Sequence, residues 1–432
     1  MLAPAAQPQD TSFLRWIMDA GYADGDGDAF GFKGPSFPDP FGSLLPPPPQ
    51  QLLLPSQQHD HLQPPQALVD DLLDAARRLD AGDSTTARGI LARLNHRLPS
   101  LPPPGHPPLL RAAALLRDAL LRLLPPTTLP QPASVSSPLD VPLKLAAHKA
   151  LADASPTVQF ASFTSTQAFL DALGAARCVH LVDFDVGFGG HWPPLMQELA
   201  HQWRHAAVPL PPPTLKVTAL VSPGSRHPLE LHLTYESLTR FAAELGIPFE
   251  FTALVFDPVS SSPPIGLSAA PDEAVAVHLP AGSGTFLPAP AHLRVVKELS
   301  PAVVVCVDHG CERGDLPLPH HALNLLRSCA ALLESMDAAG ASPDVVSKIE
   351  QFILRPRVER LALGGDKLPP PLQSMFASAG FAPLQLSNAA EAQAECLLRR
   401  TANHGFHVAK RQAALALWWQ RSELVSVSAW RC

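Results

Sequence analysis

The stretch between residues 178 and 199 constrains the fold of this chain most strongly. A short apolar run is interrupted only by His180 and ends at an acid, Asp183, and glycines then dominate the following turn. Trp192 begins a segment with two prolines near its start, which is typical of a helix because the first amides of a helix have no internal partner. Strand, glycine-rich turn and helix form the opening unit of a doubly wound α/β sheet, where ligands usually bind.

Two interpretations of this turn follow from its residues. In the first, the glycines bring the backbone close to a nucleotide-like cofactor. The chain would then be a methyltransferase-like enzyme that depends on S-adenosylmethionine, or a Rossmann protein that binds another small ligand. In the second, the glycines only let the strand and the helix pack closely, and nothing binds. A single glycine-rich turn is weak evidence for a cofactor, so we predict no cofactor and no catalytic residues.

Two features argue against S-adenosylmethionine in particular. Methyltransferases of this fold typically carry Asp-x-Gly-x-Gly-x-Gly after the first strand, and Asp185 occupies the first of those glycine places. Its carboxylate would oppose the carboxylate of the cofactor. The predicted second strand ends in Leu-Val-Ser-Pro at residues 220–223, without an acid to accept ribose hydroxyls. We also expect Phe184, Phe188 and Trp192 to fill the crevice by packing.

Charge and cysteine pattern narrow the class of protein. A formal net charge of −7 argues against a globally basic nucleic-acid binder, and no apolar run approaches a membrane span, which predicts no membrane contact. The cysteines lack the spacing of a disulfide scaffold and predict reduced thiols in an intracellular protein. Cys306, His309 and Cys311 lie close in sequence. However, Cys306 falls in a predicted buried strand and no fourth ligand is evident, so we predict no metal site.

Composition divides the chain near residue 67. The chain carries 50 prolines, and residues 1–67, which are rich in Pro and Gln, are predicted to form a disordered arm. Within this arm the segment from Phe13 to Met18 has apolar residues at helical spacing. It is interpreted either as a docking motif that folds on a partner or as an apolar patch in a flexible tail. Residues 68–432 are predicted to be the ordered domain.

Residues 68–124 predict a helical cap. Their leucines keep helical spacing in three segments, and those of the third segment follow a heptad seam. Arg111, Arg117 and Arg122 lie away from that seam, which makes them the candidate partner surface. In the alternative interpretation the three helices only pack within the chain. The seam covers only about two heptads, which favours this alternative.

Residues 178–432 predict the core of the fold. Strand and helix patterns alternate through most of this part, and near-continuous apolar strands are typical of a parallel sheet covered on both faces. Alternating apolar residues at 413–419 and again at 425–429 predict an antiparallel hairpin at the end of the chain. The predicted fold class is therefore α/β, with a Rossmann-like (methyltransferase-like) core sheet, a helical cap and a C-terminal antiparallel hairpin.

Several motifs, in order, resemble those of the plant GRAS transcription regulators. Residues 68–124 resemble the first leucine-rich region, and residues 349–360 resemble part of the PFYRE region. Further details are similar to the Hairy Meristem (scarecrow-like) branch, although His191 stands where these relatives usually carry Gln. The VHIID-like motif consists of Val179, His180, Leu181, Val182 and Asp183, and the SAW-like motif of Ser428, Ala429 and Trp430.

The resemblance implies a nuclear transcription regulator, without enzyme activity, in plant development or meristem control. Its partners would be other transcription regulators, with a homo- or heterodimer and direct contact with promoter DNA as further expectations. Phosphates are held by Lys and Arg side chains, so basic residues are the candidates for DNA contact, the alternative for each being a solvated helix face. The candidate DNA-contact surface consists of Arg355, Arg357, Arg360, Arg399, Arg400, Lys410 and Arg411.

Overall fold

The computed structural model describes most of the chain beyond residue 64. The described ranges are 65–98, 105–125, 137–205, 213–222, 226–256, 264–282, 288–309, 316–363, 371–401, 404–411 and 413–432. Residues 1–64 of the predicted disordered arm, including the segment that begins at Phe13, lie outside them.

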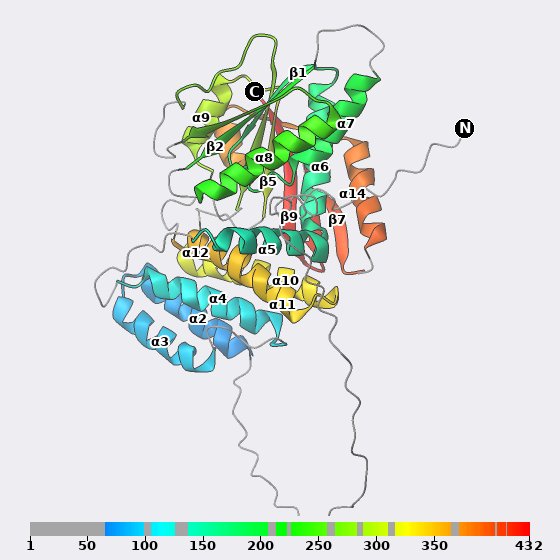
Figure 1. Ribbon diagram of the computed structural model, residues 1–432. Helices are drawn as coiled ribbons and strands as arrows, with labels where there is room; N and C mark the ends of the chain where they lie inside the picture. The colour runs from blue at the N-terminus through cyan, green and yellow to red at the C-terminus, as the bar shows by residue number, and fades with distance from the viewer. Residues whose placement is uncertain are drawn as a thin grey trace, which may run out of the picture.

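One mixed sheet forms the centre of the described part of the chain (Figure 1). Its strands run in the order β3-β2-β1-β4-β5-β9-β8-β7, and β6 pairs with β9 beside this path. The first five strands are mutually parallel, whereas β9 is antiparallel to β5 and to β8. The strands are β1 (Cys178–Asp183), β2 (Thr214–Val221), β3 (Phe249–Val255), β4 (Ala274–Ala281), β5 (Val303–Asp308), β6 (Ala382–Leu384), β7 (Phe406–Arg411), β8 (Ala414–Trp419) and β9 (Ser422–Arg431).

Helices cover both faces of this sheet. On one face α6, α7 and α8 share a hydrophobic core with β1 side chains such as Leu181, and on the other α9 and α13 share a second core with Val182. Neighbouring residues of a strand point to opposite faces, so a strand buried on both sides must be apolar throughout. These helices are α6 (Pro156–Leu173), α7 (Trp192–Arg204), α8 (Pro228–Leu245), α9 (Pro290–Glu298) and α13 (Leu372–Ser378).

The helical cap is built from two distant parts of the sequence. The expected helices α2, α3 and α4 are present, and α4 and α2 pack against α10, while α4 also packs against α12 (Figure 1). The cap therefore extends beyond the predicted residues 68–124. Its helices are α2 (Pro65–Asp80), α3 (Ser84–Arg97), α4 (Pro108–Leu123), α10 (Leu318–Ala338) and α12 (Arg355–Leu363), with α5 (Asp140–Ala154) and α11 (Pro343–Ile349) beside them.

The helical turn just before Pro356 is wider than an α-helical turn. The chain passes from α11 through a π-helical segment, η1 (Glu350–Leu354), directly into α12. Pro356 lacks the amide hydrogen that would bond to an earlier carbonyl, and its ring crowds the preceding turn. A π-helical turn is a common way to accommodate such a disturbance without ending the helix.

The predicted hairpin is present, but it lies inside the sheet rather than at its edge. Leu415 faces Val427 and Leu417 faces Val425 across β8 and β9. On its other side β9 pairs with β5, where Ala429 faces Val305. The edge strand β7, the short β6, α13 and α14 (Asn388–Arg400) did not follow from the sequence patterns.

Candidate functional site

The carboxylate of Asp183 is the centre of a buried polar cluster at the sheet. Asp183 is the last residue of β1 and lies beside β4. The order of the strands in the sheet runs one way from β1 to β3 and the other way from β1 to β4 and β5. Open α/β sheets bind ligands at such a switch point. Its Oδ2 accepts hydrogen bonds from Nε2 of His191 at 2.8 Å and from Nε1 of Trp192 at 2.9 Å. Its Oδ1 accepts from Nδ1 of His278 and from the backbone amide of Asp185, each at 3.0 Å.

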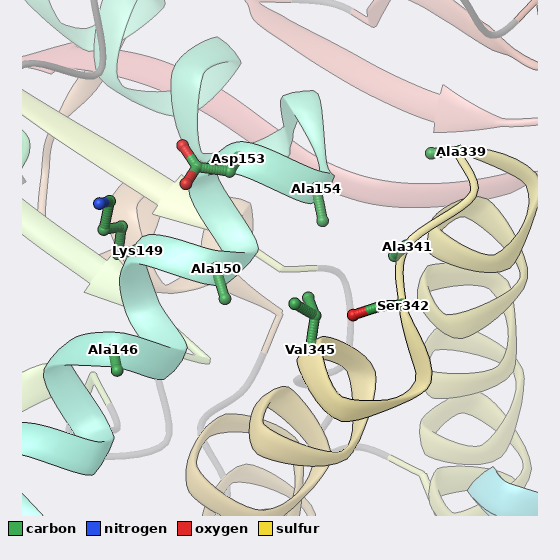
Figure 2. A pocket seen from close by; sticks show the side chains of 9 residues that line it. All are labelled: Ala146, Lys149, Ala150, Asp153, Ala154, Ala339, Ala341, Ser342 and Val345. Carbon is green, nitrogen blue, oxygen red and sulfur yellow. The ribbon is translucent and has the colours of Figure 1, made fainter. Parts of the chain in front are cut away.

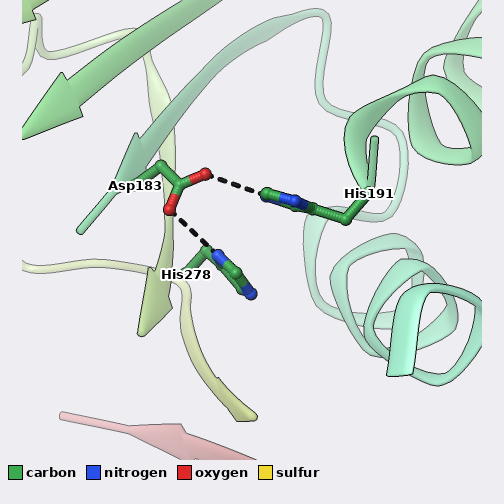
Figure 3. Close-up of side chains that lie close together, drawn as sticks. All are labelled: Asp183, His191 and His278. Carbon is green, nitrogen blue, oxygen red and sulfur yellow. Dashed lines mark hydrogen bonds and ion pairs between the residues drawn. The ribbon is translucent and has the colours of Figure 1, made fainter. Parts of the chain in front are cut away.

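Two histidines converge on this carboxylate from different elements (Figure 3). His278 comes from β4, directly beside Asp183 in the strand register, and His191 immediately precedes α7. Their ring centroids are 4.4 Å apart. Burial raises the pKa of Asp183, but the two histidines outweigh burial and hold that pKa well below its usual range. Burial, together with His278, lowers the pKa of His191 below its usual value, against the opposing effect of Asp183.

The chain's own side chains occupy the turn beyond β1. Asp185 forms an ion pair with Arg226, whose guanidinium also lies 3.5 Å from Glu230 of α8. Lys144 of α5 approaches Glu230 at 2.7 Å. Because each carboxylate is matched by a cation, the cluster satisfies its buried charges internally.

The three bulky residues around the turn are buried, as the sequence predicts, but they serve both faces of the sheet. Phe184 packs edge-on against Phe256 in the core beneath α9. Phe188 and Trp192 belong to the opposite core, where Trp192 contacts Phe169 of α6 at 5.6 Å between ring centroids. They fix the turn between the two cores rather than line one crevice.

The other members of the VHIID-like motif are held within the sheet. Val179, Leu181 and Val182 are buried in the two cores. His180 is also fully buried, and its Nε2 lies 2.8 Å from Oγ1 of Thr218 on β2, while its Nδ1 lies 3.2 Å from Glu273. Burial lowers the pKa of His180 from its usual value.

The SAW-like motif also has a packing role. Ala429 is buried between β5 and β6, and Trp430 stacks on Phe376 of α13 with 4.5 Å between ring centroids. The indole Nε1 of Trp430 donates to the hydroxyl of Ser428 at 3.0 Å. This motif therefore joins the end of the chain to the helix that covers the sheet.

With this geometry established, the comparisons with known proteins identify the family. A family model described as the GRAS domain family matches residues 68–431. The chain belongs to the GRAS domain family.

Relatives and a solved structure agree with this assignment. The chain is 42% identical over 373 residues to Scarecrow-like protein 6 of Arabidopsis thaliana, covering 85% of this chain and 63% of that protein. It is 39% identical over 384 residues to Scarecrow-like protein 27 of Arabidopsis thaliana, covering 84% of this chain and 58% of that protein. The chain thus spans about three fifths of the length of these relatives. The crystal structure of SCL7 in Oryza sativa matches with a TM-score of 0.61 and 27% identity, over 84% of this chain and 99% of that one.

In this GRAS domain, the arginines proposed as a partner surface do not form one. Arg111 is buried, with Nε 2.6 Å from Glu350 and Nη1 3.2 Å from Asp337. Arg117 is fully buried and donates to the carbonyl of Leu98 and to Asp118. The sequence-based expectation that these two lie exposed is wrong, because α10 and η1 cover Arg111, and Arg117 packs against the end of α3.

Of the three arginines, Arg122 alone retains an exposed side chain. Its exposed fraction is 57%, and its Nη2 lies 3.0 Å from Glu359 of α12. It too connects α4 to the later part of the cap.

The seven basic residues proposed for DNA contact fall into two separate places in the GRAS domain. Arg355, Arg357 and Arg360 lie on α12 in the cap, where Arg357 is buried and Arg355 pairs with Asp118 at 2.8 Å. The residues outside the cap lie on α14 and on β7, against which α14 packs (Figure 1). The expectation of a single basic surface is therefore wrong. Four of the seven are exposed on these two elements, namely Arg399, Arg400, Lys410 and Arg411.

Two hollows in the described residues lie away from Asp183. One, of about 430 Å³, lies between α5 and the start of α11, where small side chains such as Ala150 and Ala341 face each other (Figure 2). The other, of about 520 Å³, is lined by residues 267–275 and the end of α9. No described helix is long and apolar enough to cross a membrane. Cys306 is buried in β5, and Cys311 lies outside the described residues.

The cluster around Asp183 was missed by sequence reasoning. Asp183 and His191 stand eight residues apart, but His278 follows 95 residues later and meets Asp183 only because β4 pairs with β1. His278 also sits in an apolar run that reads as ordinary strand core. The sequence feature that could have indicated this cluster is a polar histidine within a predicted buried strand.

Proposed function

We propose that this chain is a nuclear plant transcription regulator that acts through protein partners. The family match over residues 68–431 is the observation that carries the proposal. The geometry at Asp183 supports it, because the ligand position of the sheet is filled by ion pairs and ring packing from the chain itself. A fold whose usual ligand position is filled can still serve as a scaffold, since function depends on the site rather than the fold. A role in meristem control, as in the Hairy Meristem branch, belongs to the same proposal.

The outer face of α3 is our revised partner surface. This helix packs chiefly against α2 and α4 and lies at the outer side of the cap (Figure 1). Its buried residues, Ala87, Ile90, Leu91 and Leu94, all point inward. Residues three and four apart share a helix face, so the opposite side forms one continuous exposed stripe. This α3 stripe consists of Thr85, Gly89, Ala92, Arg93 and His96.

Two measurements test the proposal, the location of the chain in the cell and its effect on transcription of a reporter gene. A fluorescent fusion of the full chain is expected in the nucleus of plant cells, and the chain tethered to a heterologous DNA-binding domain is expected to change reporter transcription. The variant Arg93→Glu should weaken that change, since it reverses a charge at the middle of the α3 stripe. Arg399→Glu, on the exposed end of α14, is the matched control and should leave the tethered reporter unchanged.

Particular results would contradict the proposal. A chain excluded from the nucleus, or a tethered chain without effect on the reporter, would oppose a regulatory role. An equal response of the two variants would remove the α3 stripe as the partner surface. Both variants should melt at the wild-type temperature, because exposed substitutions usually change stability by less than about 0.5 kcal/mol.

DNA contact through α14 and β7 is a second candidate function. The exposed basic residues at this place lie on two packed elements, and the guanidinium of Arg411 lies 5.5 Å from the ring centroid of Trp418. An aromatic ring beside cations suits contact with nucleic acid. Nearby acids compensate much of the charge, since Arg399 lies 3.3 Å from Glu395 and Arg411 2.8 Å from Glu423. We therefore rank DNA contact second to partner binding as a proposed function.

Salt dependence distinguishes a phosphate contact from a solvated helix face. If Arg399 and Arg400 contact phosphates, binding to duplex promoter DNA should weaken in the double variant Arg399→Gln, Arg400→Gln. The slope of log affinity against log salt should then fall by about 1 for each contact removed. Arg93→Gln serves as the control for loss of an exposed arginine elsewhere. An unchanged slope would show that Arg399 and Arg400 of α14 face solvent and do not contact DNA phosphates.

A further inference from the structure

The side chains of Asp183, His191 and His278 place three metal-ligating atoms together at the junction of β1, β4 and α7. A carboxylate oxygen, Nε2 of His191 and Nδ1 of His278 all lie within 4.8 Å of one another (Figure 3). Each ligand comes from a different element, so their convergence is a property of the tertiary structure. From this convergence, we propose that the cluster binds a zinc ion, with one carboxylate and two imidazoles as protein ligands.

The chemistry of the ligand set favours zinc over Mg²⁺ and Ca²⁺. Imidazole nitrogen and carboxylate oxygen are both normal zinc ligands, whereas Mg²⁺ and Ca²⁺ select sites made of oxygen alone. Two histidines and one acid leave the fourth position of a tetrahedral ion to water. His191 has 23% of its side chain exposed, so the cluster lies within one side chain of solvent.

The ring nitrogens of both histidines already face the carboxylate. Each imidazole now bonds to Asp183 through the nitrogen nearest to it. Zinc binding requires that the ligating nitrogen of each ring carry no proton, so that any ring proton lies on the other nitrogen.

The competing interpretation is a hydrogen-bonded cluster that binds no ion. The four donors around Asp183 would suffice to satisfy a buried carboxylate. Ligand bonds of about 2.0–2.2 Å place ligand atoms of a tetrahedral zinc ion roughly 3.3–3.6 Å apart. The Asp183–His191 and Asp183–His278 atom pairs, now 2.8 and 3.0 Å apart, must therefore separate slightly, and a pair at the 4.8 Å limit must approach by roughly 1.2–1.5 Å. Trp192 and the amide of Asp185 would keep their bonds to the carboxylate as supports from outside the ligand set.

A bound ion would tie the start of α7 to two strands of the sheet. Because the three ligands meet only in the folded chain, zinc would bind the folded state in preference to the unfolded state and raise the melting temperature. The proposed role is therefore structural: it holds the glycine turn and the first turn of α7 in place.

Zinc titration of the full chain tests the proposal. The chain is purified without a histidine tag, freed of metal with a chelator and titrated with Zn²⁺ by calorimetry, and one strong site is expected. His191→Gln should weaken that site by roughly 100-fold or more, because even supporting contacts outside the ligand set contribute about 10- to 100-fold. The side-chain amide of Gln can still donate a hydrogen bond to Asp183, so the fold is expected to survive.

The matched control is His201→Gln. His201 and His205 form an exposed pair at the end of α7 with 4.5 Å between ring centroids, and two such imidazoles can bind zinc adventitiously. The strong site should persist in this variant. Should His191→Gln bind zinc as tightly as the wild type, or should His201→Gln abolish the strong site, the proposal is wrong.

Two further measurements keep the test decisive. Circular dichroism and melting of metal-free His191→Gln should match those of the metal-free wild type, which separates ligand loss from misfolding. If this variant fails to fold, Co²⁺ substituted into the wild-type chain reports the ligands directly. Visible bands of a nitrogen and oxygen site, without sulfur charge-transfer bands, support the cluster. Sulfur bands, or no Co²⁺ binding at all, contradict it.

Discussion

At the scale of single residues, two glycines of the turn after β1 show how one conformation can have two causes. Gly187 and Gly189 both have left-handed backbone, with φ of +56° and +72°. A Cβ atom on Gly187 would meet nothing within 4 Å, whereas one on Gly189 would lie 3.1 Å from Leu238 and 3.2 Å from Thr234. Gly187 is thus required by conformation alone, and Gly189 also by the close approach of α8.

This difference predicts unequal costs. Gly187→Ala should lower the free energy of unfolding by about 1–2 kcal/mol, the cost of left-handed backbone for a residue with Cβ. Gly189→Ala should lower it by about 1–3 kcal/mol more, because the side chains of Leu238 and Thr234 must shift to admit the methyl group. Urea denaturation of the two variants measures both values. Equal losses of unfolding free energy in the two variants would show that the side chains on α8 accommodate the methyl group without cost.

The buried arginine of α4 gives a second prediction at this scale. Arg111→Ala leaves Glu350 and Asp337 without their cation, and burial already raises the pKa of Glu350. Breaking such a buried pair costs about 3–5 kcal/mol of stability. Arg122→Ala is the control, because its exposed pair with Glu359 is expected to contribute less than about 1 kcal/mol. Comparable melting temperatures for the two variants would contradict the assignment of Arg111 to the interior.

His292 predicts a dependence of stability on acid. Its side chain is fully buried, its Nδ1 accepts from the amide of Ala289 at 2.9 Å, and burial lowers its pKa to about 4. The unfolded chain binds this proton near pH 6.5, so stability is complete above that pH and is lost as the pH falls toward 4. The slope from this group is about 1.4 kcal/mol per pH unit.

Chemical denaturation at pH 7 and at pH 5 measures the effect of His292. In His292→Gln the amide oxygen can replace the acceptor without titrating, so the loss between the two pH values should be smaller than in the wild type. If the loss is unchanged, other groups determine the acid sensitivity.

At the scale of elements, β9 connects the two halves of the sheet. It pairs with β5 of the parallel half and with β8 of the antiparallel half, and Trp430 fixes α13 above it. Removal of residues 426–432 should abolish soluble folded protein, because β5 and β8 would both lose a neighbour and expose unpaired backbone. Removal of the exposed Cys432 alone is the control. A truncated chain that melts cooperatively at the wild-type temperature would contradict this role.

At the scale of the whole molecule, the α/β sheet raises the question of a cofactor. S-adenosylmethionine is expected not to bind, because Asp185 pairs with Arg226 where the cofactor would approach the backbone, and Trp192 fills the space beside Asp183. Calorimetric titration should show no heat up to millimolar cofactor, a limit of about −4 kcal/mol in binding free energy. Saturable micromolar binding that is lost in Gly187→Val would restore the enzyme interpretation.

Much of the fold follows from local patterns in the sequence. The apolar run of β5, the alternation in β8 and β9 and the helix end at Gly246, whose φ is +70°, all express periods or conformations carried by neighbouring residues. The glycine-rich turn and the helix that follow β1 likewise indicate that Asp183 lies at the end of a strand. Such features are readable because backbone hydrogen bonding and side-chain period act over a few residues.

The sequence by itself determined the class of fold, the family motifs and the position of the turn after β1. The tertiary structure decided which polar groups are buried and which of them meet. The leucine seam of α4 predicts that Arg111 is exposed. In the structure α10, more than 200 residues later in the sequence, covers it. His278 reads as strand core, yet the pairing of β4 with β1 places it on Asp183. Burial and electrostatic contact are set by distance in space, and the long-range pairings that set this distance leave no period in the sequence.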